Sequence, residues 1–420
     1  MSTIKISDPD IVRRSAIIAI FALALVACDR KPLPKAGDLR AEVEALVPKV
    51  EASAGLKFKT PPNVATQSRA EVQKFLLDQF AKPAVRRDLD YKIGVWKRLG
   101  VVPDTADVIG LLTRLLTEQV VGFYDPKRKT LFVVEGRNGV ERETVIRHEL
   151  THALQDQYVN LDSIQNIQND DDRVEAAQAV FEGHATVMMI GNASRTIAWD
   201  KARESIRDAR ASNPVFGSAP SFIAEGLLFP YLGGAEFVRT AMGDGISSAQ
   251  LLAELPSSTS QVLHREKWGA KGNAAEVVRF TAASGATIRY ENSFGEFETR
   301  LLLAELLGDV ARGAAAARGH DGDRYAVLAF PSGDGLALVT AWDTPLDAEE
   351  FAETAASAMA KRYGSTVVST KGQREIIASG RRVTVRTEKV GTRDITVLED
   401  VPDGVRSPVV TAAAVTLTPR

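Results

Sequence analysis

The sequence predicts an α+β protein in which a helix-rich domain is followed by a smaller α+β domain. Two observations support this prediction. Apolar residues recur at helical spacing through much of residues 38–273, whereas short apolar strands predominate in residues 274–420. The chain has 420 residues, more than one average hydrophobic core holds, so two folded domains are expected.

The composition indicates a globular protein and says little about partners. Apolar residues make up 45% of the chain and charged residues 25%, and the net charge is -2. A charge so close to zero gives no electrostatic reason to expect nucleic-acid binding. Partners must therefore be inferred from individual sites, and nothing in the sequence indicates an oligomeric state.

Residues 1–28 are expected to be an export signal. Basic residues precede an apolar run from Ala16 to Ala27, which is shorter than the roughly 20 residues that a membrane-spanning helix needs. The run ends at Cys28, the only cysteine of the chain, so an intramolecular disulfide is excluded.

The segment Leu25-Val26-Ala27-Cys28 resembles the lipobox of bacterial lipoproteins. That resemblance implies lipidation of Cys28 and a membrane-anchored location in the bacterial cell envelope, facing the periplasm or the cell exterior. Asp29 resembles an inner-membrane retention signal and so favours the inner membrane. Residues 29–37, which contain two prolines, are expected to form an extended tether.

The first domain is expected to contain mostly helices. A capping box from Ser68 to Glu71 predicts a helix start. The polar turn at 125–129, between apolar runs at 120–124 and 130–134, predicts a β-hairpin. Pro and Gly are frequent between residues 214 and 245. The predicted elements are helices at 39–50, from 72 to 80, from 108 to 115, 141–159 and 170–190, and strands at 56–60, 120–124 and 130–134.

The second domain is expected to pair short strands with one helix. The strands are predicted at 326–330, 336–342 and 395–398, and the helix at 347–363. An arm rich in Ala and Gly, residues 311–322, precedes them. His320 is expected in a turn that leads into the first of these strands, and Trp342 and Phe330 are expected in the core.

The chemistry-bearing motif is His148-Glu149-Leu150-Thr151-His152, within the helix predicted at 141–159. Residues four apart on a helix are separated by about 40° around its axis, so both imidazoles can bind one metal ion. Glu149 flanks that position and can take a proton from water as a general base. The opposite face carries Ile146, Leu150, Leu154 and Tyr158, which are expected to pack against a core.

A catalytic zinc site needs a third protein ligand and one open position, and without spare thiols that ligand must be His, Asp or Glu. Glu182 is the preferred candidate because the neighbouring Gly183 and Ala185 would let its helix approach closely. Glu175 is the rival. The two glutamates are seven residues apart on one predicted helix, and one ion cannot reach both.

The motif His148-Glu149-Leu150-Thr151-His152-Ala153 resembles that of the thermolysin family, and Phe181-Glu182-Gly183-His184-Ala185-Thr186 resembles the Glu-Gly segment of aminopeptidase N-like gluzincins. The wider stretch from Gly122 through Glu182, together with residues 229–231 and 258–264, resembles a family of uncharacterised bacterial gluzincin-like lipoproteins. The resemblance implies a zincin-like fold for residues 38–273, zinc as the metal and Glu182 as third ligand.

Two features depart from those families. The 29 residues between His152 and Glu182 exceed the usual spacing. Thr186 stands where thermolysin-like enzymes have an Asp that orients a ligand.

Several other polar residues have open roles. Tyr231, expected in a Pro/Gly-rich turn, and His264 are candidates for stabilising an oxyanion, and either is equally compatible with a packing or surface role. Asp156 is expected to be either an outer-shell partner of a ligand or a solvated carboxylate. His184 is expected to be structural. By resemblance, the strand 120–124 would be the edge to which an extended peptide adds, and an interior hairpin is the alternative.

The sequence therefore predicts a zinc-dependent metallopeptidase that acts on polypeptides in the cell envelope. The alternative is a non-catalytic zinc-binding lipoprotein that binds or assembles a partner. Glu149 favours the enzyme, because a purely structural zinc site gains nothing from a carboxylate beside an open coordination position.

Overall fold

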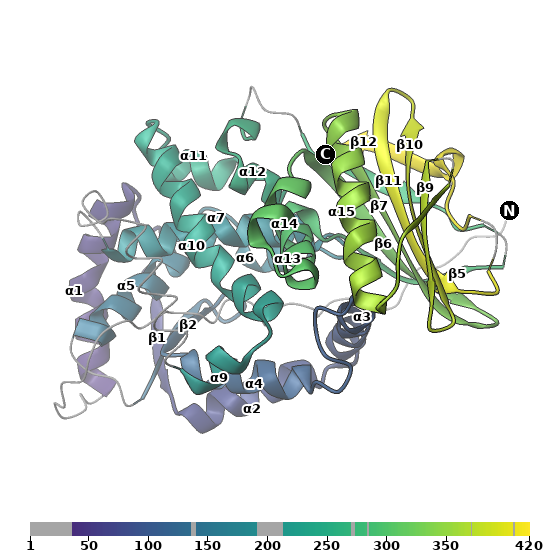
Figure 1. The fold of residues 1–420 in the computed structure, drawn as a ribbon. Helices are drawn as coiled ribbons and strands as arrows, with labels where there is room; N and C mark the ends of the chain where they lie inside the picture. Colours follow the sequence, from purple (N-terminus) through teal and green to yellow (C-terminus); the bar gives the residue numbers. More distant parts are fainter. Residues whose placement is uncertain are drawn as a thin grey trace, which may run out of the picture.

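The structure is a computed structural model that describes residues 36–135, 140–190, 213–269, 274–283, 285–370, 372–405 and 408–420. Helices and strands are mixed, which confirms the predicted α+β class. Figure 1 shows most of the helices on one side of the molecule and a large sheet on the other. The predicted signal segment, Cys28 and residues 29–35 of the predicted tether lie outside the described residues.

The helix-rich part begins with a helix at Ala36, inside the stretch predicted as tether. The predicted capping box at Ser68 and Glu71 is present and starts the second helix. Among the described helices, none is long and apolar enough to cross a membrane. The helices of this part are α1 (Ala36–Ala54), α2 (Arg69–Phe80), α3 (Pro83–Leu99), α4 (Val108–Gln119), α5 (Val140–Gln155), α6 (Leu161–Gln165), α7 (Asp171–Ile190), α9 (Pro214–Ser218), α10 (Ser221–Gly243), α11 (Ser248–Ala253), α12 (Thr259–Leu263) and the 3-10 helix η3 (Arg265–Lys267).

A three-stranded sheet lies beside α5. It contains β1 (Asn63–Gln67), β2 (Gly122–Asp125) and β3 (Thr130–Val134) in the order β1-β3-β2. β2 and β3 form the predicted antiparallel hairpin, and β1 pairs in parallel with β3. β2 is therefore at an edge of this sheet. An edge position is required if an extended peptide is to add to this strand, as was predicted for residues 120–124.

The helices α7 and α10 cross at very close range. A Cβ atom added to Gly183 would lie 2.1 Å from the carbonyl carbon of Gly234, and one added to Gly234 would lie 1.9 Å from the carbonyl oxygen of Ala179. Only glycine fits at both positions. The expected close approach at Gly183 is thus present, and α10 is the helix that it approaches.

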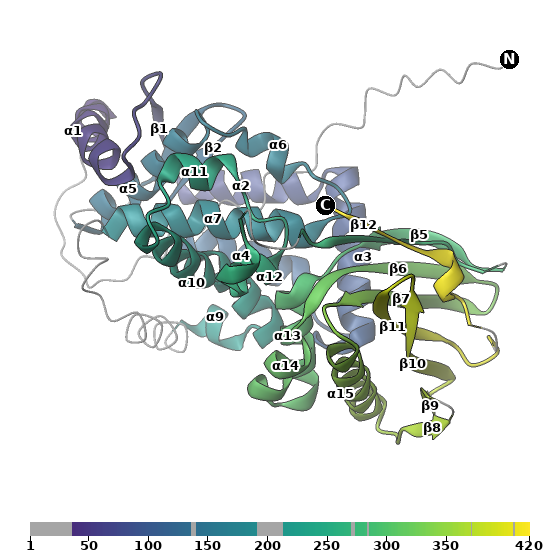
Figure 2. The ribbon, with the colours of Figure 1, turned by 90° about the horizontal axis from the view of Figure 1, so that it is seen from above.

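The second part is built on an antiparallel seven-stranded sheet in the order β5-β6-β7-β11-β10-β9-β8. Alternate residues of β7 face opposite sides: Leu336 and Leu338 pack toward α15, whereas Ala337 and Val339 join a core with β4 and β12. Figure 2 shows α15 and β12 on opposite faces of this sheet. The elements are β4 (Glu276–Phe280), β5 (Thr287–Asn292), α13 (Gly295–Leu307), α14 (Val310–Ala316), β6 (His320–Phe330), β7 (Gly333–Trp342), α15 (Pro345–Tyr363), β8 (Val368–Thr370), β9 (Gln373–Ala378), β10 (Arg381–Val390), β11 (Arg393–Pro402), η4 (Ala412–Ala414) and β12 (Val415–Pro419).

The predicted strands at 326–330, 336–342 and 395–398 lie within β6, β7 and β11, and the predicted helix at 347–363 lies within α15. Trp342 is buried, and Phe330 is half-buried against the core that includes β4 and β12. One apolar core joins residues from before and after the predicted boundary near residue 274, from Val72 to Leu398. The boundary itself stays a prediction.

Four local predictions were wrong. Residues 56–60 are not a strand, because β1 comes later, at Asn63–Gln67. The Pro/Gly-rich stretch is mainly the long helix α10, which accommodates Pro230 in its interior. His320, expected in a turn, is the first residue of strand β6, and residues 311–316 of the preceding arm are in helix α14. Tyr158 lies beyond the end of α5 and is 37% exposed, so it does not extend the apolar face of that helix.

Candidate metal centre

Helix α5 supplies the two histidines. His148 and His152 are one turn apart, and both are buried. The apolar face of α5 is held in the core, since Ile146, Leu150 and Leu154 are all fully buried. A helix fixed in this way gives its ligands little freedom to move, as a metal site requires.

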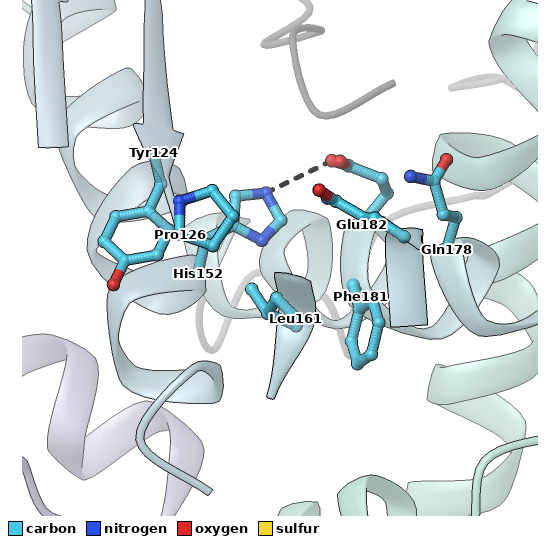
Figure 3. A pocket seen from close by; sticks show the side chains of 8 residues that line it. Tyr124, Pro126, His152, Leu161, Gln178, Phe181 and Glu182 are labelled. Atoms are coloured by element: carbon cyan, nitrogen blue, oxygen red, sulfur yellow. Dashed lines mark ion pairs between the residues drawn. The ribbon is translucent and has the colours of Figure 1, made fainter. Parts of the chain in front are cut away.

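Helix α7 supplies the third candidate ligand, Glu182. Its Oε2 lies 3.1 Å from Nε2 of His148 and 3.3 Å from Nε2 of His152, and the two Nε2 atoms are 3.1 Å apart. Figure 3 shows the side chains of His152 and Glu182 directed toward each other from their two helices. Among the described residues, these three form the one cluster of His, Cys, Asp or Glu side chains that could hold a metal ion.

These distances fit a tetrahedral zinc ion. Ligand atoms placed about 2.0–2.1 Å from zinc at tetrahedral angles are separated by about 3.3 Å, and the three separations here are 3.1, 3.1 and 3.3 Å. Two imidazole nitrogens and one carboxylate oxygen are also a donor set that zinc accepts. The fourth tetrahedral position would remain for water or substrate.

The electrostatics of the cluster are those of tightly packed ligands. Burial alone would raise the pKa of Glu182, but the two histidines outweigh it and lower that pKa to about 2. Burial likewise opposes the charged form of His152, but the carboxylate of Glu182 raises the pKa of His152 to about 9. For His148 burial dominates and lowers the pKa. The carboxylate thus stays ionised beside two imidazoles, as a metal ligand must.

Glu149 lies beside the triad without belonging to it. It is buried, and its Oε2 has no hydrogen-bond partner among the residues that the structure describes. Its carboxylate accepts a hydrogen bond from the backbone N–H of Tyr124, and burial raises its pKa to about 8. The position leaves one carboxylate oxygen available for a further donor.

The edge strand β2 faces this carboxylate. Val121 accepts a hydrogen bond from Val134 of the partner strand, so the alternation of an antiparallel ladder directs the main-chain groups of Gly122 and Tyr124 away from β3. A Cβ atom on Gly122 would lie 3.3 Å from the Cγ of Glu149. The free edge of the sheet therefore borders the candidate metal site.

A small pocket opens at the same place (Figure 3). It includes two of the three metal-ligand candidates and has a largely apolar wall. The residues that line it are Tyr124, Pro126, His152, Leu161, Gln165, Gln178, Phe181 and Glu182.

Tyr231 lies next to His148, with ring centroids 6.1 Å apart and the planes inclined by 23°. The residue is buried in α10, and the turn predicted for it does not exist. The close crossing of α7 and α10 through Gly183 and Gly234 brings this helix to the site. The structure thus places the first of the two oxyanion candidates beside a metal-ligand candidate.

His264 has a different neighbour. Its Nε2 lies 2.7 Å from Oε1 of Glu296 on α13, and no contact in the described part of the chain joins it to the metal-ligand candidates. Its catalytic role therefore stays a prediction from the sequence.

The remaining candidates lie outside the cluster. Burial raises the pKa of Glu175, and the nearby carboxylates, Glu298 first among them, raise it further. The carboxylate of Asp156 is buried and accepts hydrogen bonds from the Tyr124 hydroxyl and from Lys129, so it is neither solvated nor bonded to a ligand. His320 pairs with Asp323.

Two further polar residues, Gln155 and His184, lie near the site. His184 is buried and contacts Gln155, in line with the structural role predicted for it. Gln155 itself contacts His152 and was missed by the sequence reasoning. Its position three residues after His152, on the same face of the helix, was the signal that could have identified it.

Comparisons with known proteins give little beyond this geometry. A family model described as "Domain of unknown function (DUF8575)" matches residues 285–407. No curated protein matches the chain significantly. A crystal structure titled "putative hydrolase with a novel fold", from Chloroflexus aurantiacus, is similar at 18% sequence identity and a TM-score of 0.35, covering 56% of this chain and 91% of that one. A similarity at this level carries no argument about fold or activity.

Proposed function

We propose that this protein is a zinc-dependent metallopeptidase. The observation that carries the proposal is the spacing of His148, His152 and Glu182, whose ligand atoms are 3.1–3.3 Å apart, with a buried glutamate beside them. A structural zinc site normally has four protein ligands, whereas a catalytic site has three and keeps a position open. The described residues supply three.

Each neighbouring group then has a chemical use. A bound zinc ion would supply Lewis-acid polarisation of a peptide carbonyl and of water. Glu149 would accept the proton of the attacking water through its available carboxylate oxygen and pass it to the leaving amine. Tyr231, whose ring is buried beside that of His148, would donate a hydrogen bond to the developing oxyanion.

The edge strand supports a polypeptide substrate. Gly122 and Tyr124 direct main-chain groups away from β3. The N–H of Tyr124 donates to Glu149, and an extended peptide would add through the other main-chain groups of this edge. Such pairing would hold a scissile carbonyl near the ligand triad. The lipobox-like segment ending at Cys28 suggests that the polypeptides are those of the bacterial cell envelope.

The test compares wild type with Glu149→Gln in zinc content and in hydrolysis of a diverse peptide library. We expect about one zinc ion per chain in both proteins. Hydrolysis by Glu149→Gln should fall by about 10²- to 10⁴-fold, because the proton acceptor is lost while the ligands remain.

Two further variants test the ligand assignment. Glu182→Ala should lose most of its bound zinc, whereas Glu175→Ala, a substitution of the same kind on the same helix, should keep it. Equal activity in wild type and Glu149→Gln, or zinc binding without any cleavage, would contradict the peptidase and favour a zinc-stabilised binding or assembly protein. The reverse ranking of the two alanine variants would overturn Glu182 as ligand and leave the histidine pair in place.

A further inference from the structure

A buried network of side chains lies behind His152, on the side of the ring away from the ligand triad. Gln155 is fully buried in the last turn of α5. Its Oε1 lies 2.9 Å from Nδ1 of His152, and its Nε2 lies 2.9 Å from the backbone carbonyl oxygen of Phe181 and 3.1 Å from Nδ1 of His184. One amide therefore joins the helix of the two histidines to the helix of Glu182.

The backbone carbonyl of Phe181 fixes the orientation of this amide. A carbonyl oxygen can only accept, so the NH₂ group of Gln155 must face it and the amide oxygen must face His152. His152 then has to donate from Nδ1, so in the neutral ring the lone pair is on Nε2. That is the tautomer in which Nε2 can bind a metal ion together with His148 and Glu182.

His184 continues the same chain of donors. The second N–H of the Gln155 amide points at Nδ1 of His184, which must accept, so the proton of His184 is on Nε2. That nitrogen lies 2.9 Å from Oγ of Ser248, the first residue of α11. His184 and Ser248 are both buried.

His148 has no such support. Its Nδ1 is buried and has no hydrogen-bond partner among the described residues. Orientation by side-chain hydrogen bonds is thus confined to one of the two histidines. The amide that contacts His152 is that of Gln155, in the same helix as the two histidines. Position 186, where thermolysin-like enzymes have an orienting Asp, is a Thr in this chain.

We propose that Gln155 is a positioning residue of the metal site and that His184 acts on His152 through it. This inference rests on the proposed role of His148, His152 and Glu182 as zinc ligands. Gln155 sets the tautomer and ring orientation of His152, and His184, held by Ser248, keeps the amide from rotating.

The first measurement is zinc affinity by chelator competition in full-length protein. Gln155→Met keeps the length of the side chain and removes its hydrogen bonds, and it should bind zinc about 10- to 100-fold more weakly than wild type. Gln261→Met is the matched control, because Gln261 is also a buried amide that bonds to backbone groups, those of Ser257 and Lys267. The control should lose stability in a thermal melt but keep its zinc affinity.

A double-mutant cycle tests the route through Gln155. His184→Leu alone should weaken zinc binding, but His184→Leu added to Gln155→Met should weaken it no further. Independent effects that add would show that His184 does not act through the amide. Unchanged zinc affinity in Gln155→Met would overturn the proposal as a whole.

A spectroscopic readout separates positioning from general packing. In zinc-loaded protein with ¹⁵N-labelled histidine, the Nδ1–H of His152 should give a resonance protected from exchange, and Gln155→Met should move or broaden it while Gln261→Met leaves it unchanged. An unmoved resonance would contradict a positioning role. The test also separates the two proposals: zinc binding without peptide cleavage would contradict the peptidase alone, and a wild type that binds no zinc would remove the basis of both.

Discussion

Glu175 lies two turns before Glu182 on α7, yet the charged groups that influence its carboxyl group are mostly acidic, and neither histidine is among them. Burial, and then the charge of Glu298, raise the pKa of Glu175 well above 4.5 despite Lys92, and the pKa of Glu298 is raised too. Both carboxyl groups therefore stabilise the fold fully below about pH 4.5 and lose this contribution as the pH rises through their folded pKa values. Urea unfolding of metal-free protein should show Glu298→Gln gaining stability relative to wild type between about pH 5 and about pH 8. The exposed Glu350→Gln should show no such gain. Equal pH slopes for wild type and Glu298→Gln would contradict this account.

At the scale of the elements, the crossing of α7 and α10 decides the geometry of the site, because one helix carries Glu182 and the other Tyr231. A Cβ atom at Gly183 would meet the backbone of Gly234 at 2.1 Å, so the helices would have to separate. Gly183→Ala should cost about 1–3 kcal/mol in the free energy of unfolding and should also weaken zinc binding. Gly226→Ala on α10 is the control, because nothing lies within 4 Å of its added Cβ. That variant should be neutral or more stable by up to about 1 kcal/mol. Comparable stabilities of the two variants in denaturant unfolding would show that the crossing tolerates a methyl group.

At the scale of the whole molecule, the proposed function depends on where the chain is held in the cell. If the lipobox-like segment is a lipoprotein signal, as we propose, the sole thiol of the chain, Cys28, would be the site of acylation. In a bacterial host, labelled palmitate should enter wild type, and Cys28→Ser should abolish both the label and the association with membranes. Cys28→Ser should keep its zinc content, because none of the ligand candidates lies near that residue in the sequence. A wild type recovered unlabelled from the soluble fraction would refute the lipoprotein assignment.

The sequence by itself determined the features that depend on short-range spacing. The His148–His152 pair follows from the periodicity of a single helix, as does the buried face of Ile146, Leu150 and Leu154. The capping box at Ser68 and the hairpin of β2 and β3 are equally local. Some helices were not predicted from local sequence patterns. Pro230 suggested a turn inside what is the long helix α10. Helix α3 was not predicted, although its apolar residues recur at helical spacing.

The tertiary structure decided which distant residues meet those local features. Glu175 and Glu182 share a helix, and only the angle at which α7 passes α5 selects Glu182 as the residue that reaches both histidines. The place of Tyr231 beside His148 and the network through Gln155 and His184 depend on the same helix crossings. Apart from the local contact between His152 and Gln155, these contacts join residues separated by tens of positions in the chain. Their geometry depends on how whole helices pack, and Gly183 and Gly234 allow the close crossing of α7 and α10. The periodicity of a single segment contains no information about such a crossing.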